Sequence, residues 1–177
     1  DPVEVWSFRA LALDARPPAD QLVSDATPAS ATYRELSGEE LRNDEPLLSA
    51  VFGLLVLAHY RTEPDDLARL LDAPNVSVHC LTHGGHVVAV ALLAREGGLS
   101  ARRRRAVSDG ERIRGHLIPD VLTSQLRDED AGEPTGWRVM RIATHAAVRS
   151  RGLGSALLDR VRERARAEGL DYLGVAY

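Results

Sequence analysis

Apolar and polar positions along the chain predict a mixed succession of strands and helices. Residues 6–14 alternate weakly, which predicts a strand or an extended segment, and residues 32–36 predict a short strand. Between them, residues 15–30 hold three prolines among small and polar residues, which is typical of a loop or linker. We therefore expect residues 1–30 to form an N-terminal strand and linker, and residues 31–177 to form the main domain.

Two helices are predicted after the short strand. Ser37 can cap the first helix, because its side chain can accept a hydrogen bond from a free amide of the first turn. Apolar residues between positions 47 and 57 cover a wide face, so this helix should be buried on several sides. The second helix should begin near Thr62 and end before Pro74.

A β-hairpin should follow the helices. Residues 76–81 and 86–93 are rich in β-branched and other apolar residues, and the segment between them contains two glycines. Three histidines flank this turn, and no carboxylate or cysteine completes a metal-binding set with them. We expect them to be solvated turn residues: His79, His83 and His86.

The second half of the chain is predicted to contain two helices, a strand, a tight turn with glycines, a strongly amphipathic helix and the start of another strand. In chain order these elements cover residues 100–108, 119–127, 137–145, 148–154, 155–167 and 173–177. Gly169 is placed to end the amphipathic helix.

The composition is that of an ordinary globular domain. The 177 residues suit one domain with a substantial core, and no apolar run approaches the roughly 18 residues of a membrane span. A single cysteine, Cys80, excludes an internal disulfide, and no Cys/His spacing resembles a zinc site. We therefore expect a cytoplasmic protein that binds neither a membrane nor a metal.

The charge distribution argues against a uniformly basic nucleic-acid-binding domain. The formal net charge is −4, although a local basic patch stays possible, and all 22 basic residues are arginines. Arg102–Arg105 are consecutive, so on a helix they would point all round rather than along one face. A solvated polar helix is the favoured interpretation, with RNA binding as the alternative. Acidic residues nearby in the sequence would dilute the positive field: Glu96, Asp109, Glu111, Asp128, Glu129 and Asp130.

The turn between the strand over 137–145 and the following helix has the character of an anion site. A turn at a helix start leaves backbone N–H groups unpaired, and the helix dipole adds positive potential. Gly152 and Gly154 would let the backbone approach a phosphate, while Arg149 and Arg151 add charge at the rim. The alternative is a glycine-containing loop that only connects two elements. The pattern has neither the third glycine of a dinucleotide fingerprint nor the G-K-[ST] ending of a P-loop.

The spacing R-x-x-G-x-G at residues 149–154 resembles the coenzyme A pyrophosphate loop of the GNAT acetyltransferases. More narrowly, the chain resembles the tRNA(Met) cytidine acetyltransferases and their RNA cytidine acetyltransferase relatives between residues 47 and 177. Five segments carry this resemblance in order: FGLLVLAHYRT at 52–62, LLDAPN at 70–75, RGHLIP at 114–119, RIATH at 141–145 and DYLG at 171–174.

The resemblance implies an α/β fold with a mixed (α+β) sheet of the GNAT type, and acetyl-CoA as the cofactor. It also implies transfer of an acetyl group to the 4-amino group of cytidine in RNA, most simply tRNA. Family members have an ATP-dependent, helicase-like module upstream and RNA-binding elements downstream. By resemblance, the strand backbone pairs with the pantetheine arm and the loop holds the pyrophosphate. The residues implied are Ile142, Ala143, Thr144, Arg149, Ser150, Arg151, Gly152, Leu153, Gly154 and Ser155.

His145 is the candidate general base, because an imidazole titrates near neutrality and this one directly follows the cofactor strand. The alternative is a histidine that holds the strand end by hydrogen bonding. His59 and His116 also lie in family-like segments, and structural roles are expected for both.

The chain departs from the family pattern at three points. Ala146 replaces a proline, no Walker-type motif occurs, and the last strand stops at Tyr177, which implies a fold truncated at its C-terminal end. Two other functions therefore stay open: acetylation of a small amine or a protein, and a non-catalytic module that binds coenzyme A.

Overall fold

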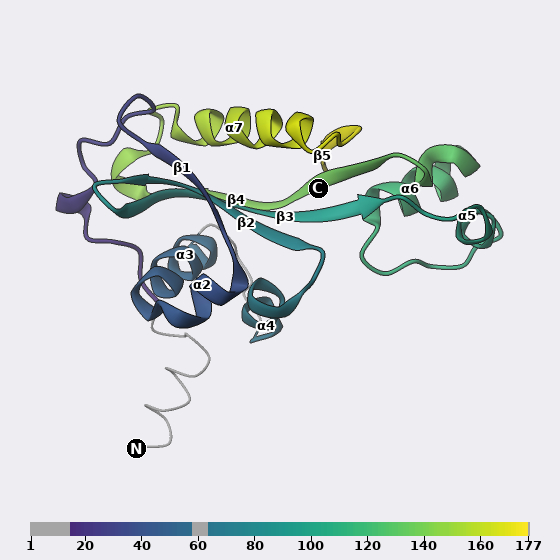
Figure 1. Cartoon of the computed structure of the whole chain (residues 1–177), viewed down its shortest axis with the longest axis horizontal. Helices are drawn as coiled ribbons and strands as arrows, with labels where there is room; N and C mark the ends of the chain where they lie inside the picture. The colour runs from purple at the N-terminus through teal and green to yellow at the C-terminus, as the bar shows by residue number, and fades with distance from the viewer. Residues whose placement is uncertain (1–14, 58–63, 177) are drawn as a thin grey trace, which may run out of the picture. The chain divides into compact units, whose positions relative to one another are not determined.

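The computed structural model describes residues 15–57 and 64–176. It contains a five-stranded sheet in the order β1-β2-β3-β4-β5 (Figure 1). The strands are β1 Thr32–Leu36, β2 Val76–His83, β3 His86–Gly97, β4 Thr135–Thr144 and β5 Tyr172–Val175. β1 pairs antiparallel with β2, whereas β4 pairs parallel with β5, so the predicted mixed sheet is confirmed. β4 is an inner strand between β3 and β5, although β3 is the middle one.

Helices connect these strands close to where the sequence predicts them. The α-helices are α2 Gly38–Asn43, α3 Glu45–Leu57, α4 Pro64–Asp72, α5 Ala101–Ser108, α6 Leu117–Leu126 and α7 Leu153–Ala167. Short 3₁₀ helices are η1 Asp20–Leu22, η2 Glu129–Gly132 and η3 Ala146–Val148. No helix within the described ranges has the length and apolar character that a membrane crossing needs.

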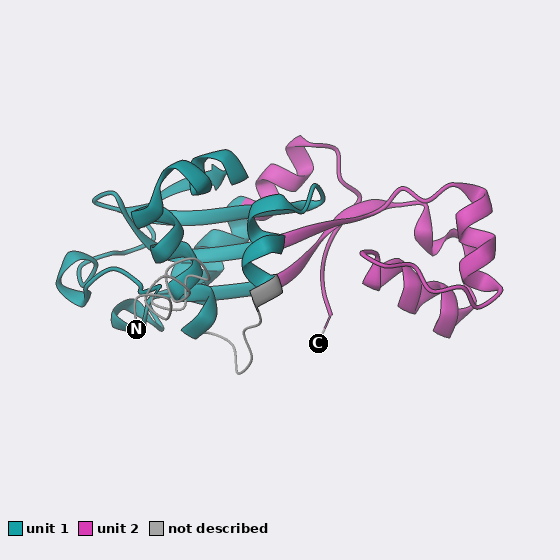
Figure 2. Cartoon of the chain, turned by 90° about the horizontal axis from the view of Figure 1, so that it is seen from below, with its two compact units in different colours: residues 1–92, 141–160 teal, residues 93–140, 161–177 magenta. Residues whose placement is uncertain are grey.

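The contacts divide the chain into two compact units (Figure 2). Unit 1 comprises residues 1–92 and 141–160, and unit 2 comprises residues 93–140 and 161–177. Within unit 1, the helices α2, α3 and α4 lie on one side of the strands and the first turns of α7 on the other (Figure 1). Apolar residues from the helices and strands of this unit are fully buried, including Val51, Val88, Val90 and Leu157.

The long first helix predicted from Ser37 is in fact two helices, which corrects the sequence interpretation. The Ser37 hydroxyl accepts a hydrogen bond from the Glu40 amide at 3.1 Å, and the Glu40 carboxylate accepts one from the Ser37 amide, so the predicted cap forms. The helix then ends at Asp44, whose side chain accepts a hydrogen bond from the Leu47 amide and starts α3. Pro46 explains the break, because proline has no amide proton and its ring would collide with the preceding turn of a continuous helix.

The predicted hairpin is confirmed, with longer strands than expected. Gly84 and Gly85 form its two-residue turn with φ of 55° and 85°, values that glycine adopts at little cost and that match the twist of the flanking strands. The predicted loop over residues 15–30 contains only η1, yet it contributes to the core of unit 1, since Val23 and Ala26 are fully buried. The strand predicted over residues 6–14 lies outside the described residues, as do Thr62 and His59.

Candidate functional site

The predicted cofactor strand is the C-terminal end of β4. β4 pairs with β5 only from Gly136, opposite Tyr172, to Val139, opposite Val175, and then continues to Thr144. Ile142, Ala143 and Thr144 therefore extend past this pairing. The N–H and C=O groups of a strand point alternately to its two edges, and an extended ligand that carries amides can pair with one such edge.

The glycine loop, residues 149–155, follows β4 and η3. Ser150 and Gly152 both have positive φ, at 62° and 83°. α7 starts at Leu153, two residues before its predicted start, so Leu153, Gly154 and Ser155 form its first turn. In the part of the chain that the structure describes, no acceptor binds any of the six consecutive amides from residue 150 to residue 155. Unpaired amides before and within the first turn of a helix form an anion-binding site, which the positive end of the helix dipole reinforces.

The first turn of α7 suits an anion in two further ways. It contains no acidic residue that would oppose a negatively charged ligand. Gly154 lies close to β4, because a Cβ at this position would stand 3.3 Å from the Thr144 hydroxyl oxygen. A larger side chain at residue 154 would therefore push the helix start away from the end of the strand.

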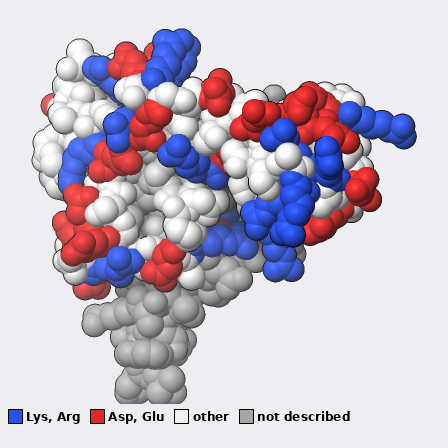
Figure 3. All heavy atoms as spheres, turned by 45° about the vertical axis from the view of Figure 1, so that its right-hand side comes forward, with Lys and Arg blue, Asp and Glu red and all other residues white. Residues whose placement is uncertain are grey.

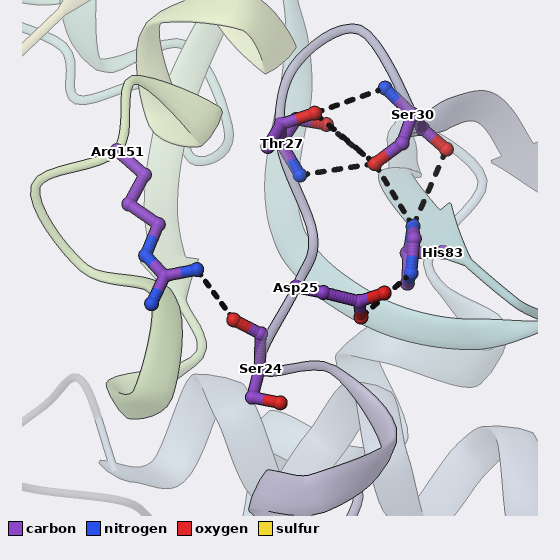
Figure 4. A network of polar contacts seen from close by, with 6 residues as sticks. All are labelled: Ser24, Asp25, Thr27, Ser30, His83 and Arg151. Atoms are coloured by element: carbon purple, nitrogen blue, oxygen red, sulfur yellow. Dashed lines mark hydrogen bonds and ion pairs between the residues drawn. The ribbon is translucent and has the colours of Figure 1, made fainter.

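The two arginines of the glycine loop have different surroundings. Arg149 is exposed, and its guanidinium has no hydrogen-bond or ion-pair partner among the described residues. Arg151 donates a hydrogen bond to the backbone oxygen of Ser24 at 2.5 Å (Figure 4). The predicted positive rim is thus present at Arg149, while Arg151 is directed toward the N-terminal segment.

That N-terminal segment is the part of the site that sequence reasoning missed. Ser24 and Pro28 approach the glycine loop, since a Cβ on Gly152 would lie 3.6 Å from the Pro28 ring. The segment is itself braced by hydrogen bonds between Thr27 and Ser30 and by the contacts of His83 with Ser30 and Asp25 (Figure 4). Sequence patterns carry no signal for these contacts, which join residues up to 127 positions apart.

His145 lies between β4 and the glycine loop, with its side chain almost fully buried. Its Nε2 lies 2.8 Å from the backbone oxygen of Pro18, which only accepts, so Nε2 carries the proton. Its Nδ1 accepts a hydrogen bond from the Ala147 amide at 3.3 Å. These contacts support the role of holding the strand end, and catalysis by His145 stays a prediction.

Of the other histidines, His79 differs from the expectation of a solvated turn residue, whereas His116 has a structural contact. His79 is not a solvated turn residue: it is fully buried in β2, stacks on Tyr33 and hydrogen-bonds the Tyr33 hydroxyl at 2.6 Å. The prediction failed because β2 is buried on both faces from Val78 to Thr82, so position 79 lies in the interior and not at the turn. His116 has the expected structural contact, since its Nδ1 accepts a hydrogen bond from the Gly97 amide at 3.0 Å. Burial of its imidazole lowers the pKa of His116, and the nearby Glu96 carboxylate opposes that shift.

Unit 2 contains a buried ion pair that the sequence does not indicate. Glu96 is 1% exposed and accepts hydrogen bonds from Nε of Arg138 at 2.5 Å and from the Ile118 amide at 2.9 Å. The charge of this buried carboxylate is therefore paired with the Arg138 guanidinium and is hydrogen-bonded to the backbone. Across residues 15–57 and 64–176, no three His, Cys, Asp or Glu side chains are placed to hold a metal ion.

Comparison with known proteins identifies relatives in sequence. The sequence model of a family described as GNAT acetyltransferase 2 matches residues 50–172. Proteins named tRNA(Met) cytidine acetyltransferase TmcA are 67% identical over 177 residues in Haloarcula marismortui and 46% identical over 178 residues in Nitrosococcus halophilus. Both comparisons cover the whole of this chain but only 23% and 24% of the relatives, so the chain spans about a quarter of their length.

Comparison with solved structures supports the fold. A ribosomal-protein-alanine N-acetyltransferase from Brucella melitensis biovar Abortus has a TM-score of 0.51 at 14% identity, over 83% of this chain and 79% of that one. A predicted acetyltransferase from Clostridium acetobutylicum, solved with acetyl-CoA, has a TM-score of 0.52 at 12% identity, over 83% and 80%. At these identities the likeness concerns the fold alone, and the family follows from the sequence match. The chain belongs to the GNAT acetyltransferase family.

Proposed function

We propose that this domain binds acetyl-CoA, with the pyrophosphate in the glycine loop and the pantetheine arm along the end of β4. The observation that carries the proposal is the run of six amides, from residue 150 to residue 155, that have no acceptor among the described residues. A pyrophosphate needs several donors at one place, and a left-handed turn before a helix supplies them without a side chain. The free guanidinium of Arg149 adds a positive charge at the same loop.

The proposed acceptor is the 4-amino group of cytidine in tRNA, with N4-acetylcytidine as the product. Its support is the 67% identity, over this whole chain, to proteins named tRNA(Met) cytidine acetyltransferase. Acetyl-CoA would supply the acetyl group as a thioester. The amine nitrogen bonds to the acetyl carbon, the carbon–sulfur bond breaks, and one amine proton is lost while coenzyme A leaves as a thiol. The cytoplasm, which contains both acetyl-CoA and tRNA, is the expected location.

The residues of this chain would bind and orient rather than react covalently. Ile142, Ala143 and Thr144 would fix the thioester through their backbone, and a strand N–H could stabilise the oxyanion of the tetrahedral intermediate. His145 can accept the amine proton only after it leaves its contacts with Pro18 and Ala147, because both ring nitrogens are engaged. Use of ATP by an upstream module belongs to the proposal for the full-length protein.

The test uses the full-length protein with tRNA, acetyl-CoA and ATP, followed by digestion of the tRNA and mass spectrometry of the nucleosides. We expect N4-acetylcytidine to form with acetyl-CoA present and not without it. Omission of ATP tests the upstream module: if that module uses ATP, less product or no product should form without it. Acetylated small amines or proteins in place of acetylated cytidine would refute the proposed acceptor while leaving the cofactor assignment intact.

A further inference from the structure

A pocket in unit 2 is lined by arginines that the acetyl-CoA site does not use. It is formed by α5 and the segment that follows this helix, and it encloses about 640 Å³. Its lining contains Arg102, Arg103, Arg112 and Arg114, together with Glu111 and two apolar residues. We call this hollow the α5 pocket.

Three of the four arginines of the α5 pocket have no partner within the described part of the chain. Among the described residues, no hydrogen bond or ion pair reaches the guanidinium of Arg102, Arg103 or Arg114. Arg112 has only a loose contact with Asp120 at 3.7 Å, and 90% of its side chain is exposed. Four guanidinium groups around one hollow repel one another, so an anion placed between them would be stabilised by all four.

Arg104, on the same helix, shows the opposite arrangement. Its side chain is 17% exposed, donates a hydrogen bond to the Leu99 oxygen and forms ion pairs with Asp130 and Glu133. Asp130 and Glu133, which follow α6, therefore neutralise the one arginine of Arg102–Arg104 that does not line the pocket. The consecutive arginines do diverge around the helix, as the sequence predicts, and three of the four, Arg102, Arg103 and Arg105, stay exposed.

The local charge balance favours a polyanion. Residues 100–116 contain six arginines and two acidic residues, in a chain whose net charge is −4. Blue side chains gather over α5 and the following segment on the right of Figure 3, with red ones at the margins. The hollow is much larger than a single phosphate ion, and its four charges are spread along its lining. Repeated phosphates on one chain match this spread better than one small anion does.

We propose that the α5 pocket binds the phosphate backbone of the RNA substrate. This inference depends on the proposed function for the choice of RNA as the polyanion. A guanidinium group can donate two parallel hydrogen bonds to the oxygens of one phosphate. Such contacts position an RNA without selecting its sequence. The pocket thus supplies affinity and orientation, and it has no part in the acetyl-transfer chemistry.

The test compares two variants of the full-length protein that each lose two positive charges. Arg103→Gln/Arg114→Gln empties the pocket of two guanidinium groups, and glutamine keeps a good helix propensity at residue 103. Arg69→Gln/Arg166→Gln is the control, because both arginines are exposed on other helices and have no partner among the described residues. Affinity for fluorescently labelled tRNA is measured by anisotropy across a salt series.

We expect the pocket variant to bind tRNA at least tenfold more weakly than the control at about 0.1 M salt, since one phosphate contact is worth nearly tenfold there. The slope of log K against log salt should fall by about 2, or about 1 per lost contact. The KM for acetyl-CoA should not change. Equal tRNA affinity and equal slope in the two variants would overturn the inference.

Two further arms separate the possible causes. Calorimetry with inorganic phosphate tests a small-anion site: saturable binding that the pocket variant loses, with tRNA affinity unchanged, would overturn the RNA assignment. The mass-spectrometric assay with wild-type protein tests the proposed function separately. Wild-type protein that binds tRNA through the pocket and acetylates no cytidine would refute the proposed reaction and support the pocket.

Discussion

Gly152 allows the electrostatic role of the glycine loop to be tested with an isosteric pair of variants. A Cβ at this position would meet only the Pro28 ring, at the ordinary contact distance of 3.6 Å, so there is room for a small side chain. The backbone is left-handed at φ 83°, which asparagine and aspartate tolerate better than other residues. Gly152→Asn and Gly152→Asp should therefore share the same strain, about 1–2 kcal/mol, and differ in charge.

The charge difference sets the expected effect on acetyl-CoA affinity. Two unit charges about 6 Å apart repel by about 1 kcal/mol at the dielectric constant of bulk water and by about 3 kcal/mol at that of a protein surface. These energies correspond to about 5-fold and about 150-fold in Kd. Calorimetric titration of acetyl-CoA should therefore give a Kd for Gly152→Asp that is higher than that of Gly152→Asn by a factor in this range. The difference should shrink as salt is raised, because screening weakens exposed charges.

Thermal unfolding of both variants provides the control for folding. Equal unfolding temperatures would show that the carboxylate acts on the ligand rather than on the protein. If the two variants bind acetyl-CoA equally well at low salt, the six free amides do not hold the pyrophosphate, and the assignment of the glycine loop is wrong.

Buried side chains give three further expected outcomes. His145→Ala should lower the free energy of unfolding by about 1–3 kcal/mol, because the Pro18 oxygen and the Ala147 amide lose their hydrogen bonds to the imidazole. If His145 is also the general base, the same variant should lower kcat by about 10²- to 10⁴-fold. Glu96→Ala should cost about 3–5 kcal/mol in urea unfolding, because Arg138 keeps a charge without its partner; a loss below 1 kcal/mol would contradict this. Burial raises the pKa of the Cys80 thiol to about 11, so Ellman's reagent should modify it only after denaturation, and prompt reaction at pH 8 would be inconsistent with the structure.

Local signals were enough to predict most elements of the fold. The glycines at 84 and 85, the Ser37 cap and the strand–turn–helix over residues 135–167 were all predictable, because each depends on residues a few positions apart. The division between α2 and α3 was missed, because the apolar face of residues 47–57 outweighed Pro46 in the interpretation.

Contacts between distant residues account for what the sequence could not show of the site. Glycine spacing predicted the loop over residues 149–155, and the structure adds the positive φ of Ser150, a residue that no spacing rule marks. The contact of Arg151 with Ser24 and the gathering of Arg102 and Arg114 in one pocket depend on chain folding. The periodicity of apolar residues predicts which face of a helix or strand is buried, but it does not predict which elements pack against each other.

The contacts of His145 with Pro18 and of Arg151 with Ser24 also constrain the order of events during synthesis. Each joins residues 127 positions apart, so the earlier partner leaves the ribosome long before the later one exists. At a synthesis rate of about 5–20 residues per second, residues 18–24 are made about 6 to 25 s before the glycine loop. Closing so long a loop adds an entropic penalty that local hairpins avoid, so the N-terminal segment should dock late. The proposed coenzyme A site would then be completed only after the local hairpins and helices of this domain have formed.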